Sequence, residues 1–110
     1  MSLEIKESDW KIYRKLHPIV LERFCRSVLS EVEQINGKSG ESYHQKYLDI
    51  FRLLKKQDKE IALLFDNPRR SAAIEMIVGL KSRNLLTNEE FLQFSEETQE
   101  RVRRILEIFG

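Results

Sequence analysis

One segment constrains the fold of this chain more than any other: residues 67–84, which read NPRRSAAIEMIVGLKSRN. Asn67 can accept a hydrogen bond from free backbone N–H groups, and Pro68 suits the first helical position, where its missing donor costs nothing. At about 100° per residue, the apolar side chains cover roughly two-thirds of the helical circumference. They are Ala72, Ala73, Ile74, Met76, Ile77, Val78, Leu80 and Leu85. Such a helix cannot lie at the edge of a domain, so we expect other helices to surround it.

Length and composition favour a single all-helical domain spanning residues 1–110. A chain of 110 residues can bury about two-thirds of the surface that its unfolded form exposes. It contains only four Gly and two Pro, and its apolar residues follow helical spacing rather than strand alternation. We therefore expect an all-α fold, an irregular bundle of about six or seven helices packed around a central buried helix at about 68–84.

The first third of the chain predicts two helices separated by a proline. Ser8 can cap a short helix from Asp9 to about Leu16, which should end near His17 because Pro18 disfavours α geometry in the preceding residue. Pro18 then begins a longer helix that runs to about Ile35. Asn36-Gly37 should end that helix, since glycine is free to adopt a positive φ.

A third helix is expected from about Glu41 to Lys56. Its apolar face carries Tyr43, Tyr47, Ile50, Phe51 and Leu54. Gln57 and Asp58 fall where this apolar face should continue, so we expect a break there, followed by a short helix from Lys59 to Phe65.

Two further helices should follow the central one. Thr87 and Glu90 have the spacing of a capping box, which predicts a short helix containing Phe91. Ser95 can cap the last helix. Gly79 lies on the narrow strip of small residues of the central helix and should allow the backbone of another helix to approach closely.

Charge and hydropathy predict a cytoplasmic protein without membrane contact. Lys+Arg (19) and Asp+Glu (18) nearly cancel, and the net charge of +1 gives no global attraction to nucleic acid or anionic lipid. No apolar run approaches the roughly 20 residues of a membrane span, and no secretory leader is evident. The single cysteine, Cys25, cannot form an internal disulfide.

Neither catalysis nor metal binding is expected. Glu41 and His44 have the spacing of one half of a di-iron site, but the second half is missing. Cys25 flanks an apolar stripe, and His17 lies about two turns away across a proline, too far to activate the thiol. We expect no enzyme, no cofactor and no metal; a metal-dependent or thiol enzyme built on Glu41, His44 and Cys25 is the least favoured alternative.

A basic corner is the candidate anion or partner site. Arg69 and Arg70 fall in the first turn of the central helix, where cations oppose the helix dipole. Free N–H groups and guanidinium groups together suit an anion or a partner's carboxylate. The candidate contacts are Arg69, Arg70, Arg52, Lys55 and Lys56. The competing interpretation is that Arg69 and Arg70 pair with Asp66 or face water.

Apolar residues that lie off the main stripes suggest an interface. The candidates are Trp10, Ile12, Tyr13, Ile19, Val20 and Leu29. If they cluster, they form a patch of the kind that marks an interface, and a symmetric dimer is the commonest way to cover one. We therefore expect a non-enzymatic protein–protein interaction or regulatory module that binds a protein partner or a second copy as a homodimer. Nucleic-acid or anion binding through the basic corner stays open as the alternative.

Overall fold

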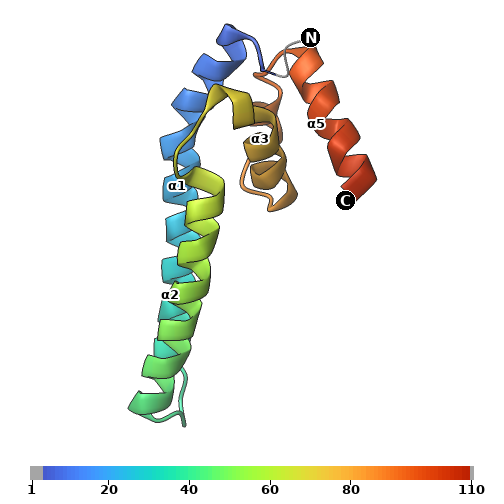
Figure 1. The fold of residues 1–110 in the computed structure, drawn as a ribbon. Helices are drawn as coiled ribbons and strands as arrows, with labels where there is room; N and C mark the ends of the chain where they lie inside the picture. The colour runs from blue at the N-terminus through green and yellow to red at the C-terminus, as the bar shows by residue number, and fades with distance from the viewer. Residues whose placement is uncertain (1–3, 110) are drawn as a thin grey trace.

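The computed structural model describes residues 4–109, which form five α-helices and one short 3-10 helix, with no strand among them (Figure 1). The elements are α1 (Glu7–Asn36), α2 (Tyr43–Phe65), the 3-10 helix η1 (Arg70–Ala72), α3 (Ala73–Ser82), α4 (Asn88–Phe91) and α5 (Glu96–Phe109). The all-helical fold is confirmed. The number of α-helices is smaller than the six or seven expected, because two pairs of expected helices are each one continuous helix.

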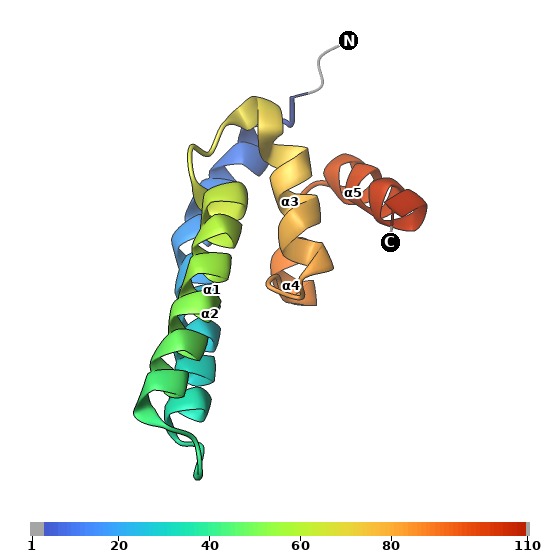
Figure 2. The ribbon, with the colours of Figure 1, turned by 60° about the horizontal axis from the view of Figure 1, so that its bottom comes forward.

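The chain forms a head and an arm. Helices α1 and α2 pack against each other as a long antiparallel hairpin, and α3, α4 and α5 gather beside one end of it (Figures 1 and 2). We call that end the head, and residues 29–63, which extend away from it, the arm. The molecule measures 57 × 24 × 23 Å, and its radius of gyration is 16.9 Å, whereas a compact domain of this length would have about 13 Å. The arm is a pair of helices without a third layer.

Helix α1 runs without interruption through Pro18, so the expected break at His17 is wrong. A proline inside a helix removes one backbone hydrogen bond and costs about 3 kcal/mol. The buried side chains on either side of it, Leu16 and Val20, keep helical spacing and pack into the same core. Burying several such side chains, at about 1.5–3 kcal/mol each, outweighs the cost of the proline.

Helix α2 is likewise continuous, so the expected break at Gln57 and Asp58 is wrong. Gln57 is half-buried and Asp58 is exposed, and neither interferes with the hydrogen bonds of the helix backbone. Ile61 and Leu64 resume the contact with the core after them. A single polar residue in an apolar stripe does not end a helix whose side chains pack against neighbours both before and after that residue.

The loop between α1 and α2 differs from expectation in one detail. Helix α1 ends at Asn36 as predicted, but Gly37 has φ −82°, in the right-handed region, and the positive φ of 85° falls on Gly40. Ser42 then begins α2, its hydroxyl accepting a hydrogen bond from the Gln45 backbone N–H at 3.0 Å.

Helix α3 begins at Ala73, five residues later than predicted. Asn67 adopts a positive φ of 51° and Arg69 is extended, so this stretch is a connection rather than a first helical turn. The buried side chains of α3 are Ala73, Ile74, Met76, Ile77 and Leu80. The helix packs mainly against α5 and α2, while Glu75 and Ser82 are exposed. Enclosure on all sides, as expected for a central helix, is therefore not observed.

A buried carboxylate holds α5 against α1. Asp9 is 1 % exposed, and its Oδ1 accepts the Ser95 backbone N–H at 2.7 Å. Its Oδ2 accepts the hydroxyls of Ser95 and Thr98 at 2.6 and 2.8 Å. Burial raises the pKa of Asp9, but the hydrogen bonds from Ser95 and Thr98 and the charge of Lys6 outweigh burial and hold it below its usual value. The predicted cap is also present, with the Thr98 N–H 3.4 Å from Ser95 Oγ.

An ion pair holds α4 against α1. The predicted capping box is confirmed, with Thr87 Oγ1 accepting the Glu90 N–H at 3.1 Å and the Glu90 carboxylate accepting the Thr87 N–H at 2.9 Å. Arg23 of α1 donates to both oxygens of the same carboxylate, at 2.8 and 3.0 Å. These contacts make the head one packed unit that supports the base of the arm.

Candidate functional site

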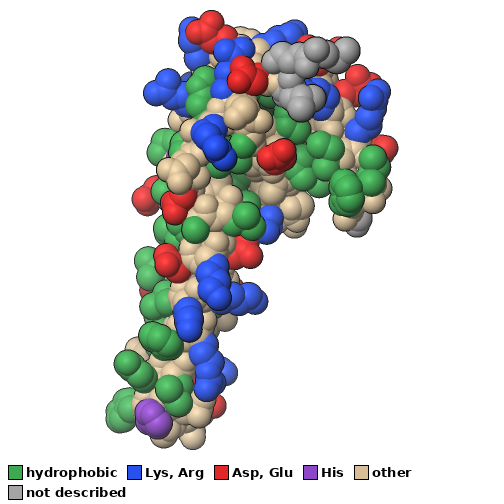
Figure 3. Space-filling model, viewed as in Figure 1, with side chains coloured by type: hydrophobic (Ala, Val, Ile, Leu, Met, Phe, Trp, Pro, Cys, Tyr) green, Lys and Arg blue, Asp and Glu red, His purple; other side chains and the backbone are tan. Residues whose placement is uncertain are grey.

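The arm exposes a row of large apolar side chains along α2. Tyr43, Tyr47, Phe51 and Leu54 are spaced so that they follow one side of the helix, and they are 88 %, 65 %, 55 % and 45 % exposed. Leu29 of α1 is 59 % exposed. We call these five residues the apolar face. Hydrophobic side chains follow one edge of the arm in Figure 3, and Lys and Arg side chains follow the other.

A groove between α1 and α2 continues the apolar face toward the head. Its volume is about 740 Å³. Its apolar walls are formed by Cys25, Val28, Leu29, Phe51, Leu54 and Ile61, and its polar rim by Lys55, Gln57 and Asp58. No residue from Leu29 to Leu63 is buried. Of the residues that line the groove, only Val28 is buried, so the groove is open to solvent.

The sequence places this surface on the same side of α2 as the residues that pack against α1. At 100° per residue, the four exposed residues of α2 and the half-buried Ile50 and Ile61 all lie within about 100° of the helical circumference. This single apolar stripe is wider than one neighbouring helix covers, and α2 packs only against α1 along most of the arm. The width of the stripe is the signal in the sequence.

Two residues of the predicted interface lie in the core instead. Tyr13 is 1 % exposed and Val20 is 0 % exposed, because the continuous α1 places both on its buried stripe. The Tyr13 hydroxyl donates to Met76 Sδ at 3.3 Å, and burial raises the pKa of Tyr13 to about 12. Trp10 and Ile12 are half-buried against the same core.

The other two predicted interface residues, Ile19 and Leu29, are exposed. Of the six candidates, only Leu29 belongs to the apolar face, and it also lines the groove.

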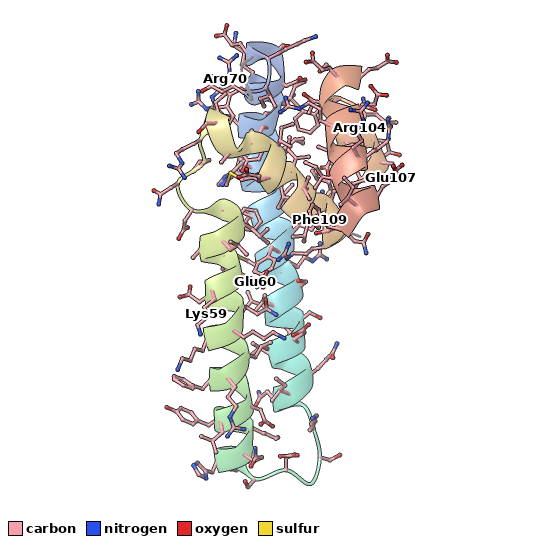
Figure 4. The ribbon with its side chains drawn as sticks, turned by 45° about the vertical axis from the view of Figure 1, so that its right-hand side comes forward. Lys59, Glu60, Arg70, Arg104, Glu107 and Phe109 are labelled. Carbon is pink, nitrogen blue, oxygen red and sulfur yellow. The ribbon has the colours of Figure 1, made fainter. Side chains whose placement is uncertain are left out.

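The structure does not bring the predicted basic corner together. Arg70 donates from Nε to the Ile5 carbonyl at 2.8 Å and lies 3.9 Å from the Glu4 carboxylate, at the end of the head far from the α1–α2 loop (Figure 4). Arg69 is exposed nearby.

The remaining three basic candidates lie on the arm. Arg52 is 3.7 Å from the Asp49 carboxylate, and Lys55 and Lys56 are exposed on α2. A central helix starting at Pro68 would have carried Arg69 and Arg70 in its first turn, near the end of α2. Instead, the connection before α3 is extended at Arg69, and Arg70 contacts the N-terminal segment through Ile5 and Glu4.

The residues of the enzyme alternative, Glu41, His44 and Cys25, do not form one site. His17 donates from Nε2 to the Phe65 carbonyl at 2.8 Å and packs edge-on against Tyr13 and Phe65. Cys25 lines the groove, and Glu41 and His44 are exposed at the tip of the arm. Within residues 4–109, no group of three or more His, Cys, Asp or Glu side chains is placed to hold a metal ion.

None of the helices in residues 4–109 combines the length and apolar composition that crossing a lipid bilayer requires. The sequence matches no protein-family model, and neither the curated proteins nor the solved structures include a significant match.

Proposed function

We propose that this chain is a non-enzymatic protein–protein interaction module that binds through the apolar face and groove of its arm. One observation carries the proposal: large apolar side chains stay exposed along a helix pair in which nothing from Leu29 to Leu63 is buried. Contiguous exposed apolar surface of this kind is rare on monomers and marks sites of interaction.

The chemistry of the head supports this interpretation. Ionisable groups with displaced pKa values are typical of active sites, but they also occur in structural contacts. Here Asp9, Arg23 and Glu90 have displaced pKa values and join one helix to another, and Tyr13 is buried in the core. The groove is lined by apolar side chains, with charged groups only on its rim. The head acts as the support, and the arm presents the binding surface.

Site-specific cross-linking in the native cell tests the proposal. A photoreactive benzoylphenylalanine in place of Phe51 should yield covalent adducts with protein, because Phe51 would lie in the interface. The matched control places the same group at Glu100, which is exposed on α5. Adducts no more abundant at Phe51 than at Glu100 would contradict the proposal.

Nucleic-acid binding is the second candidate, and the edge of the arm favours it. Helix α2 exposes Arg52, Lys55, Lys56 and Lys59. Lys and Arg side chains follow one edge of the arm in Figure 3. Such binding weakens steeply as salt rises, because phosphate contacts release counterions. Lys55→Glu with Lys56→Glu should abolish it, whereas Arg69→Glu with Arg70→Glu should abolish it only if the head takes part. An absence of DNA or RNA retardation at low salt would reject this candidate.

A further inference from the structure

We infer that the partner covering the apolar face is a second copy of this chain, and that two arms pack together as a four-helix bundle. The inference rests on the proposed function and names its partner. Three observations carry it: the surplus of exposed surface, the spacing of the apolar residues and the charges at the edges of the arm.

The first observation is accessible surface. The chain exposes 7901 Å², whereas a compact monomer of 13.1 kDa exposes about 6,400 Å². The surplus of about 1,500 Å² exceeds the roughly 800 Å² that each partner contributes to a standard interface and falls in the range of permanent homodimers. A second arm of equal length would cover a surface of this size.

The second observation is the spacing of residues along the two helices. On α2, Tyr47, Leu54 and Ile61 are seven residues apart, and Ile50, Gln57 and Leu64 interleave with them. Steps that alternate between three and four residues are typical of helices in coiled coils and four-helix bundles.

On α1, the same alternation of four and three steps joins apolar residues along the helix. These residues are Leu21, Cys25, Val28, Val32 and Ile35. One copy supplies two helices with this spacing, which is half of a four-helix bundle. Gln57, half-buried on the rim of the groove, would be the polar residue that fixes the register of the two copies.

The third observation is charge. Helix α1 carries Glu22, Glu31 and Glu33 on the exposed surface of the hairpin, with Arg26 among them. Helix α2 carries the exposed basic residues Arg52, Lys55, Lys56 and Lys59, with Asp58 among them. These basic side chains lie mostly on the side of α2 opposite Tyr43, Tyr47 and Leu54, so two arms packed through the apolar face would leave them in solvent and bring no cluster of like charges together.

Sedimentation of the purified full chain over a dilution series tests the inference. The wild-type protein should sediment at about twice 13.1 kDa at high concentration and dissociate on dilution. Phe51→Glu with Leu54→Glu should be monomeric throughout, because both side chains are exposed in the monomer and would be buried in the dimer. The matched control, Leu92→Glu with Ile108→Glu, changes two exposed apolar residues outside the arm and should still dimerise.

Cys25 gives a readout that needs no variant. Its thiol lines the groove, so alkylation of the wild-type protein should slow as its concentration rises through the dimerisation range. An alkylation rate that does not depend on concentration would overturn the inference even if the glutamate variants failed to fold.

The outcomes separate this inference from the proposed function. A wild-type protein that is monomeric at every concentration, or an arm variant that dimerises like the wild type, overturns the inference. If the protein is monomeric and cross-links at Phe51 to a different protein, the partner is not a second copy. The proposed function as an interaction module is then retained. A monomer without adducts at Phe51 overturns both.

Discussion

At the scale of the residue, Glu90 shows how one carboxylate joins local and tertiary structure. Its capping of the Thr87 N–H is local, whereas its partner Arg23 is 67 residues away in sequence. The hydrogen bonds from Arg23 lower the pKa of Glu90 to about 2, and those from Thr87 add to this effect, while burial opposes both. Because the folded pKa lies below the ordinary glutamate value of 4.5, ionised Glu90 stabilises the fold above that pH and the contribution disappears as the pH falls toward 2.

Replacement of Glu90 tests this assignment. Glu90→Gln should lower the free energy of unfolding by on the order of 2 kcal/mol at neutral pH, because it removes a charge-assisted pair in which the Glu90 side chain is only 14 % exposed. Urea unfolding measured across the acid range should show the difference from wild type shrinking toward zero. Glu89→Gln, which changes the exposed neighbour, should have little effect at any pH. A difference that stays constant with pH would contradict the role of the ion pair.

At the scale of the element, α1 stays helical through Pro18 because the packing of its buried side chains outweighs the backbone hydrogen bond that the proline removes. Pro18 is exposed, so its ring contributes little to the core. The continuous stripe from Tyr13 to Val28 on the same helix is buried along the head. Tertiary packing therefore overrides the local preference for a break.

Removal of the proline should stabilise the protein. Pro18→Ala restores a backbone donor for the Arg14 carbonyl and should raise the free energy of unfolding by about 1–2 kcal/mol. Pro18→Gly restores the same donor without alanine's helix propensity, and its gain should be smaller by about 1 kcal/mol. Thermal and urea unfolding measure both. A loss of stability in Pro18→Ala would show instead that the head requires the local geometry imposed by the proline.

The contact between α2 and α3 depends on Gly79. A Cβ atom at this position would lie 2.8 Å from Leu64 Cδ2, closer than van der Waals contact allows. Helix α2 approaches α3 closely at Gly79 through the buried side chain of Leu64, whereas the prediction was an approach of the helix backbone.

A double-mutant cycle tests this contact. Gly79→Ala should lower stability by about 1 kcal/mol, because overpacking against Leu64 exceeds the gain in helix propensity. In the background of Leu64→Ala, the same change should stabilise the protein, since the obstructing methyl group is gone. Urea unfolding of the four proteins gives the coupling energy. An equal effect of Gly79→Ala in both backgrounds would mean that the two residues do not interact.

At the scale of the whole molecule, the head and the arm differ in how their helices are held. The head contains the buried core, the Asp9 network and the Arg23–Glu90 pair. The arm relies on half-buried contacts between two helices, so its backbone hydrogen bonds should open at lower free energy.

Hydrogen exchange should resolve this difference. In dilute solution, amides of the arm should exchange faster than those of α3. Raising the concentration should slow exchange in the arm and leave α5 unchanged, if a second copy covers the arm. The Phe51→Glu, Leu54→Glu variant provides the control, since its arm should exchange fast at every concentration. Arm amides as slow as those of α3 in the most dilute sample would contradict the division into head and arm.

The sequence by itself determined the features that a few neighbouring residues encode. Helical spacing and the scarcity of Gly and Pro predicted an all-helical chain, and the Thr87–Glu90 capping box and the end of the second predicted helix at Asn36 were confirmed. These signals are local because a helix is held by hydrogen bonds between residues four apart, and its caps act within one turn.

Only the tertiary structure decided which helices continue and which apolar rows are covered. Pro18 and Gln57 lie within unbroken helices because the core on either side of them favours continuation. Tyr13, predicted to be a surface residue, is buried, while Phe51 is exposed. Burial depends on which neighbour packs on a given face, and that neighbour is distant in sequence. An apolar row is therefore visible in the sequence, but its partner is visible only in the fold.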